Sequence, residues 1–399
     1  MRTASRFSRK SLFLVILCPL FISTGYCLLH SAFFVSSSYS ELRTPNSELS
    51  SPPLGLPSPI PVPETNPLTP EKVNLGRRLF FDHRLSPNDT MSCAMCHVPT
   101  QGFTVNETRL AVGINGKTTK RNPPALYNVA YQRLLFHDGR EFALEDQTIS
   151  PLTNPLEMGN PSIGYVVEKI RRLSGYEEQF RRVFGEGVSV ATLGKALASY
   201  ERTLLSANSP FDRWYFMRDK TAVNQEVKAG FKLFSGKGQC STCHTLSKEG
   251  ALFTDQGFHN TGVAQVQLVP EKTVGVDLGG GLTVQMPRAQ VEEILTPPGQ
   301  DLGRYEVTLD PTDLWRYKTP SLRNVAVTAP YMHNGVLLTL PDVIEYYDGG
   351  GTGSEGQDPR IAPLHLTSAE KRELLAFLQS LTGDNVQTLA QESAERKAP

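Results

Sequence analysis

Apolar residues recur at helical spacing in several parts of the chain. One stripe directly follows Ser189, a residue type that caps helices, and consists of Val190, Leu193, Leu197, Tyr200 and Leu204. Its period predicts a helix with one face in the core. A Thr-Pro pair at the start of residues 69–81 predicts a second helix. A capping box predicts a third helix over residues 367–381, with Gly383 as its stop.

The two ends of the chain lack such periodicity. Basic residues precede an apolar stretch from Leu12 to Ile22, which is typical of a targeting segment. We expect residues 1–35 to be a signal peptide, with an N-terminal anchor in the inner membrane as the alternative, so that the protein is periplasmic. The Ser- and Pro-rich residues 36–67 predict a disordered linker. Residues 386–399 are expected to form a loose polar tail.

Charge and composition exclude one class of partner. The 399 residues include 40 Lys and Arg and 40 Asp and Glu, so the formal net charge is zero. No basic run is long enough to follow a phosphate backbone, which argues against nucleic-acid binding. The 32 Gly and 29 Pro favour a soluble protein with many loops.

Two runs carry recognisable chemistry, Cys93-Ala-Met-Cys96-His97 and Cys240-Ser-Thr-Cys243-His244. Both have the C-x-x-C-H pattern that attaches a c-type haem. The two thiols form thioethers with one porphyrin, and the adjoining histidine binds the iron from one face. The alternative, a pair of zinc knuckles, needs further Cys or His ligands at matching spacing. After Cys27 the chain has no cysteine other than the four in these motifs. The sequence therefore predicts two covalent haem c groups.

Short motifs repeat in the same order around the two haem runs. Asn122-Pro-Pro-Ala-Leu-Tyr-Asn128 matches Thr319-Pro-Ser-Leu-Arg-Asn324, and nine residues after each closing Asn stands a histidine, His137 or His333. Such a repeat indicates an internal duplication. We therefore predict a mostly α fold of two cytochrome-c-like haem domains.

The repeat also sets the expected domain boundaries. The N-terminal domain is expected over residues 68–215 and the C-terminal domain over residues 216–385. The Gly-rich stretch from about 262 to 311 has no counterpart in the first half and is expected to be an insertion.

Further motifs point to a known family. In chain order they are Leu79-Phe-Phe-Asp82, Arg121-Asn-Pro123, Asp138-Gly-Arg140, Leu144-Glu-Asp-Gln147, Asn154-Pro155 with Glu157-Met158, Glu201-Arg-Thr203, Thr319-Pro-Ser-Leu-Arg-Asn324 and Ala329-Pro-Tyr-Met-His333. With them the chain resembles the bacterial di-haem cytochrome c peroxidases and their relative MauG. The resemblance implies that hydrogen peroxide is reduced to water at the N-terminal haem. Electrons would come from a small donor protein, a cytochrome c or a cupredoxin, through the C-terminal haem.

The repeat indicates which iron is open. Tyr347 stands fourteen residues beyond His333, whereas the matching position beyond His137 is Pro151, which cannot bind iron. We therefore expect an open N-terminal haem and a closed C-terminal haem. The family places a Met or a Tyr on the closed iron, so Tyr347 is the predicted ligand and Met332 the alternative.

The resemblance also assigns the open pocket and a metal site. It implies that Glu157 is the catalytic acid and base, with Gln147 as its orienting hydrogen-bond partner. It implies a calcium ion between the domains, bound by the side chain of Asn122 and the backbone carbonyls of Thr328 and Pro330. Members of the family are often homodimers.

Two positions depart from the family. Members that need reductive activation carry a histidine that blocks the N-terminal iron, but no histidine lies between His97 and His137 here. We expect a site that is accessible without activation. His137 itself stands where the family often has a Trp between the haems. It is instead a candidate to hydrogen-bond a haem propionate or to ligate a haem, and His333, its counterpart in the repeat, is a candidate for haem contact too.

Two other functions stay open. A MauG-like oxidase would store two oxidising equivalents in a bis-ferryl state and modify a partner protein. Tyr347 and the missing blocking histidine favour this reading, whereas His137 at the relay position counts against it. The other is an electron-transfer cytochrome without turnover, against which Gln147 and Glu157 argue.

Overall fold

The computed structural model describes residues 51–265, 273–277, 283–287 and 301–394. Within them the fold is mostly helical, and its longer helices are α2 (Pro70–Phe80), α6 (Ile163–Arg172), α7 (Tyr176–Phe184), α8 (Val190–Glu201), α10 (Gln225–Ser235), α13 (Leu340–Asp348), α14 (Ser368–Gln379) and α15 (Val386–Ala394). The shorter helices are α3 (Cys93–Cys96), α4 (Leu144–Gln147), α5 (Ser150–Thr153), α9 (Pro210–Tyr215) and α12 (Tyr305–Thr308). None of the described helices is long and apolar enough to cross a membrane.

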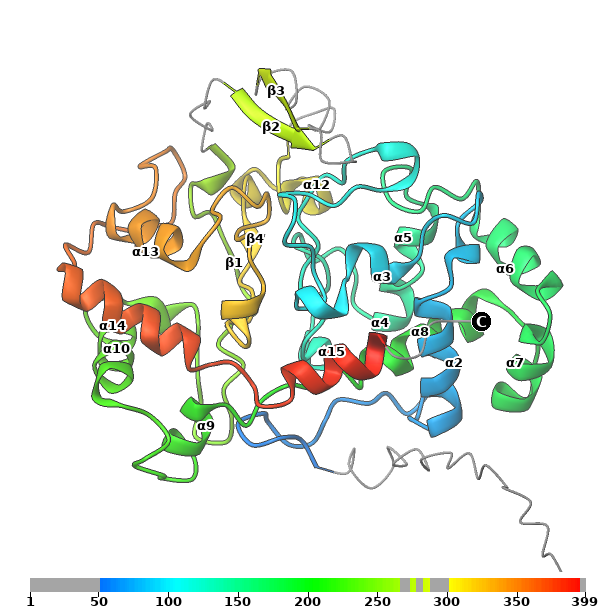
Figure 1. Cartoon of the computed structure of the whole chain (residues 1–399), viewed down its shortest axis with the longest axis horizontal. Coiled ribbons are helices and arrows are strands. Elements are labelled where there is room, and N and C mark those ends of the chain that lie inside the picture. Colours follow the sequence, from blue (N-terminus) through cyan, green and yellow to red (C-terminus); the bar gives the residue numbers. More distant parts are fainter. Residues whose placement is uncertain (1–50, 266–272, 278–282, 288–300, 395–399) are drawn as a thin grey trace, which may run out of the picture. The chain divides into compact units, whose positions relative to one another are not determined.

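The strands form two small antiparallel pairs. In the first, β1 (Phe258–His259) pairs with β4 (Tyr317–Lys318). In the second, β2 (Thr273–Asp277) pairs with β3 (Thr283–Pro287) inside the stretch that was expected to be an insertion. Figure 1 shows this hairpin as the two arrows labelled β2 and β3. The mostly α character that the sequence predicts is therefore confirmed.

The three predicted helices exist, and their starts follow from the expected caps. The side-chain oxygens of Thr69, Ser189 and Thr367 accept backbone N–H groups in the first turns of α2, α8 and α14. Two details differ. Val190, the first residue of the stripe, is 42% exposed because it lies in the first turn of α8, outside the packed face. Helix α14 ends at Gln379, two residues before Leu381.

Two pairs of helices cross at close range. Helix α2 packs on α8, and α10 packs on α14, as Figure 1 shows. At each crossing a glycine allows the backbones to touch. A Cβ atom on Gly76 would lie 1.8 Å from the carbonyl oxygen of Ala196, and one on Gly230 would lie 1.9 Å from that of Glu373. Each pair has its own apolar core, one containing Leu79 and Leu193 and the other rich in Phe side chains.

Two segments that were expected to be loose are packed. The linker prediction is wrong for residues 51–67, because Leu56 and Ile60 are buried and Asn66 donates to Glu145 Oε1 at 2.8 Å. The tail prediction is wrong for residues 386–394, which form α15. That helix packs Val386 against the first core. In both segments a few apolar residues stand in a polar sequence, and their burial needs partners far away in the chain. Residues 1–50, and with them the predicted signal peptide or anchor, lie outside the described part.

Candidate functional site

One cavity of about 780 Å³ connects the two C-x-x-C-H runs. Both motif histidines and three of the motif cysteines line it, namely His97, His244, Cys96, Cys240 and Cys243. None of the four motif cysteines forms a disulfide. Burial raises the pKa of the Cys96 and Cys240 thiols to about 12, so both are neutral before a haem is attached. A single hollow that each motif lines with its histidine and at least one cysteine suits two thioether-bound porphyrins.

Each motif histidine is held in the orientation that an iron ligand needs. Nδ1 of His97 donates to the carbonyl oxygen of Phe103 at 3.0 Å, and Nδ1 of His244 donates to that of Phe253 at 2.9 Å. These bonds fix the tautomer and leave Nε2 unprotonated to bind metal. Burial lowers the pKa of both rings, which favours the neutral form. Both accepting residues have positive φ angles, 56° and 52°. The two motifs thus share the same local geometry.

The predicted catalytic pair lies together at the N-terminal end of the cavity. Gln147 at the end of α4, Pro151 in α5, and Glu157 all line it. Burial raises the pKa of Glu157, opposed by Arg140 and by a hydrogen bond from Asn154. Nδ2 of Asn154 donates to Glu157 Oε1 at 2.6 Å, which leaves Oε2 for another partner. A half-buried carboxyl with one oxygen held in place is suited to move a proton. The role of Asn154 was not foreseen from the sequence.

Both candidate ligands of the C-terminal iron also line the cavity. Tyr347 lies near the end of α13, half-buried, and its pKa is raised by burial and then by Tyr346, Cys240 and Cys243. Met332 reaches the same cavity from a backbone with φ of +73°. Cys240 and Cys243 of the C-terminal motif line the same cavity as Tyr347. The choice between these two ligands stays a prediction.

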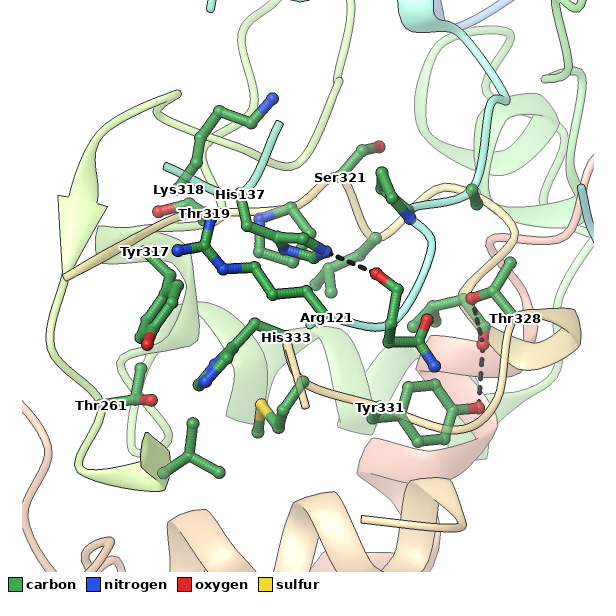
Figure 2. A pocket seen from close by; sticks show the side chains of 18 of the residues that line it. Arg121, His137, Thr261, Tyr317, Lys318, Thr319, Ser321, Thr328, Tyr331 and His333 are labelled. Atoms are coloured by element: carbon green, nitrogen blue, oxygen red, sulfur yellow. Dashed lines mark hydrogen bonds between the residues drawn. The ribbon is translucent and has the colours of Figure 1, made fainter. Parts of the chain in front are cut away.

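His137 and His333, which stand at matching positions in the sequence, both line the cavity and are labelled in Figure 2. The carbonyl oxygen of His137 accepts the N–H of Lys318, and that of His333 accepts the N–H of Asn122, both at 2.7 Å. The spacing from Asn122 to Lys318 equals that from His137 to His333. The two hydrogen bonds are therefore reciprocal. The N-terminal part of the chain supplies one N–H and one carbonyl oxygen, and so does the C-terminal part.

The rings of these histidines are neutral. Burial lowers the pKa of His137 to about 4 and that of His333 to about 3. Nε2 of His137 donates to the carbonyl oxygen of Asn122 at 2.8 Å, so Nδ1 carries a lone pair. His333 instead stacks on Tyr317, with ring centroids 3.5 Å apart and planes 9° from parallel. The aromatic group beside His333 is therefore Tyr317 from β4, which the sequence did not single out.

An ion-pair network next to these rings was also missed. Arg121 binds both carboxylate oxygens of Asp301 at 2.7 Å and one of Asp138 at 2.6 Å. Asp301 belongs to the stretch without a repeat counterpart, so no sequence signal linked it to the first half. The three expected calcium ligands line the same cavity, and Nδ2 of Asn122 donates to the carbonyl oxygen of Arg109 at 2.9 Å. Calcium binding stays a prediction.

One further cluster gathers at the C-terminal motif. Ligand atoms of Cys243, Asp255 and His259 lie within 4.8 Å of one another. A zinc reading does not fit, because both nitrogens of His259 are engaged by carboxylates, of Asp255 at 2.8 Å and of Asp358 at 3.0 Å. The cluster is an ion-pair network at the cavity wall. Cys243 is therefore left for haem attachment, as the C-x-x-C-H motif predicts.

Comparisons with known proteins agree with this geometry. The family model of the di-haem cytochrome c peroxidases matches residues 70–221. The methylamine utilization protein MauG of Methylorubrum extorquens is 37% identical over 330 residues, covering 82% of this chain and 83% of its own. The cytochrome-c peroxidase IdrP1 of Denitromonas iodatirespirans is 36% identical over 339 residues, covering 83% and 86%.

Solved structures are similar as well. A MauG-like protein associated with microbial copper homeostasis superposes with a TM-score of 0.68 at 29% identity, covering 88% of this chain and 98% of its own. The di-haem peroxidase BthA of Burkholderia thailandensis gives 0.65 at 27% identity, covering 80% and 88%.

Fold, paired motifs and cavity together define an oxidoreductase with two haem groups. The chain belongs to the family of di-haem cytochrome c peroxidases and MauG.

Proposed function

We propose that this protein reduces hydrogen peroxide to water at the N-terminal haem, with electrons that a small redox protein delivers to the C-terminal haem. The reaction consumes two electrons and two protons for each peroxide and releases two waters. The observation that carries the proposal is the asymmetry of the cavity. Its N-terminal end has Glu157 and Gln147 together with Pro151, whereas its C-terminal end has Tyr347.

The side chains at the N-terminal end would handle the protons. When bound, the haem supplies an iron at which peroxide is reduced and through which electrons arrive. Glu157 would accept a proton from peroxide and return it to the departing oxygen through Oε2, since Asn154 holds Oε1. Gln147 would orient the substrate by a hydrogen bond. Pro151 offers no metal ligand and leaves the space between these side chains open.

We also infer that the chain consists of two cytochrome-c-like domains related by duplication, residues 68–215 and 216–385. The matched glycine crossings at Gly76 and Gly230 support this inference. The reciprocal backbone hydrogen bonds of His137 and His333 support a two-fold arrangement of the halves. A calcium ion at Asn122, export to the periplasm and a homodimer remain parts of the proposal that rest on the family resemblance.

A MauG-like oxidation of a partner protein is the second candidate. The half-buried phenol of Tyr347 beside the C-terminal motif favours it, because an anionic phenolate ligand would stabilise higher oxidation states of iron. The neutral His137 counts against it, since imidazole is far harder to oxidise than indole.

Peroxide turnover by the purified holoprotein tests the leading proposal. Consumption of peroxide would be followed with reduced cytochrome c as donor, in the wild type and in Glu157→Gln. The variant keeps the shape of the side chain but cannot take up a proton, so the rate should fall by roughly 10²–10⁴-fold. Glu178→Gln, at an exposed position on α7, is the matched control and should turn over normally.

The outcomes separate the candidates. Rapid turnover that depends on Glu157 supports the peroxidase. Slow turnover, with the oxidising equivalents retained for long periods, supports the oxidase. A wild-type protein that is inert to peroxide leaves only electron transfer.

A further inference from the structure

We propose that Lys318 binds a propionate carboxylate of one of the two haem groups. This inference rests on haem attachment alone and holds for each of the candidate functions. It starts from the charges in the wall of the cavity. Six basic side chains of Lys and Arg line that cavity: Lys120, Arg121, Arg140, Lys318, Arg323 and Arg360.

Five of these six cations already have a carboxylate partner. Lys120 pairs with Glu306, Arg121 with Asp301 and Asp138, Arg140 with Asp138, Arg323 with Asp212, and Arg360 with Asp358. Among the described residues no carboxylate pairs with Lys318. Lys318 is therefore the one basic side chain in the described wall without a carboxylate partner. The cavity that it lines has to accept two porphyrins, each with two carboxylates.

The surroundings of Lys318 hold its ammonium group in place without neutralising it. Nζ donates to the side-chain oxygen of Gln132 at 2.8 Å and to the carbonyl oxygen of Leu134 at 2.7 Å. Both acceptors are neutral. An ammonium group has three N–H donors, so one is left for another acceptor. Figure 2 shows the side chain extending from β4 away from Arg121, on the same wall as His137.

The ammonium group of Lys318 is half-buried, and a desolvated charge is costly without a counter-ion. Burial lowers the pKa of Lys318 to about 8, and the charge of Asp138 offsets this only in part. Asp138 cannot serve as the missing partner, because Arg121 and Arg140 already bind it. Buried charges are normally paired. A propionate would supply the negative charge that the protein itself does not.

The backbone of Lys318 fixes where this charge lies. Its N–H donates to His137 at the boundary between the halves, and its neighbour Tyr317 stacks on His333. The ammonium group is thus tied to the region between the two motifs. A carboxylate bound there would orient its porphyrin within the cavity as well as compensate the charge.

The reduction potentials of the two haems, measured by spectroelectrochemical titration of the holoprotein, test this proposal. Removing a cation beside a propionate favours the ferric state, so Lys318→Met should lower the potential of one haem. We expect at least a tenfold change in the ferric-to-ferrous ratio, which is about 59 mV for one electron. Lys318→Arg should stay near the wild type. Lys120→Met removes a cation that already has a partner and serves as the control.

The pH dependence of the haem reduction potential distinguishes direct contact between Lys318 and a propionate from the effect of a distant charge. In Lys318→Met the freed propionate regains a higher pKa, so the potential of that haem should fall with rising pH between about pH 5 and 7. The wild type should lack this added slope, because in that range His137 stays neutral, Asp138 and Arg121 stay charged, and Glu157 titrates alike in both proteins. A lowered potential without this slope would mean that no propionate is bound.

A pyridine haemochrome assay first checks that each variant carries two haems. If Lys318→Met loses haem, the milder Lys318→Gln is titrated instead and the same outcomes apply. Potentials equal to those of the wild type in a fully loaded variant overturn the proposal. That result would leave the peroxidase proposal intact, because peroxide turnover depends on Glu157 and not on Lys318.

Discussion

The glycine crossings allow a quantitative test of the fold. In Gly76→Ala the new Cβ atom would lie 1.8 Å from the carbonyl oxygen of Ala196, and in Gly230→Ala it would lie 1.9 Å from that of Glu373. Real Cβ atoms essentially never come closer than 3.0 Å. The obstacle is the backbone of the partner helix, which cannot rotate away as a side chain can. The helices have to separate at the crossing.

The expected cost follows from two opposing terms. Overpacking a core costs roughly 1–3 kcal/mol, and a rigid backbone contact belongs at the upper end of that range. Alanine regains up to about 1 kcal/mol of helix propensity over glycine. We therefore expect a net loss of about 2 kcal/mol. For a domain of this size that lowers the unfolding temperature by about 4–8 °C.

Thermal unfolding of the holoprotein, followed by circular dichroism and by haem absorbance, measures this loss. Gly164→Ala in α6 is the matched control, because its nearest neighbour would be Ser162 Oγ at an ordinary 3.8 Å. This control should unfold at or slightly above the wild-type temperature. If Gly76→Ala and Gly230→Ala behave like the control, the close crossing of α2 with α8 and of α10 with α14 is wrong.

Two further predictions concern the two ends of the cavity. Tyr347→Phe should change the absorption and paramagnetic resonance spectra of one haem only. If Tyr347→Phe leaves both spectra unchanged and Met332→Leu changes one of them, Met332 is the ligand of the C-terminal iron. Asn154→Ala removes the N–H that stabilises the anionic form of Glu157, so the pKa of Glu157 should rise. Only the carboxylate accepts the proton of peroxide, and the rate is lost as pH falls through that pKa. The acid limb of the stopped-flow pH profile should therefore move to higher pH, and a profile identical to the wild type would remove Asn154 from this role.

Part of the site was predictable because its chemistry is local. Two cysteines and a histidine that attach one haem have to lie within five residues, so the motifs are visible in the sequence. Helix caps act over three residues, which is why the starts of α2, α8 and α14 were predicted correctly. Glu157 and Gln147 were assigned through the family resemblance, and the structure places both in one cavity.

Contacts between distant residues were not predictable in this way. Leu56 and Val386 stand in polar surroundings in the sequence, yet both contribute to packing because partners from elsewhere in the chain cover them. Asp301 lies 180 residues from Arg121, which it binds, in a stretch that matched nothing else in the chain. No periodic pattern marks a residue whose partner is that far away.

The sequence by itself determined the cofactor chemistry, the helical character and the order of the repeated motifs, because each depends on residues that are close together in the chain. Only the tertiary structure decided which side chains meet at the boundary between the halves. There His137 lies beside Lys318, Tyr317 stacks on His333, and Lys318 has no carboxylate partner in the described part of the chain. Such neighbours arise from the packing of whole helices and strands, and charge balance can be judged only after every partner is in place.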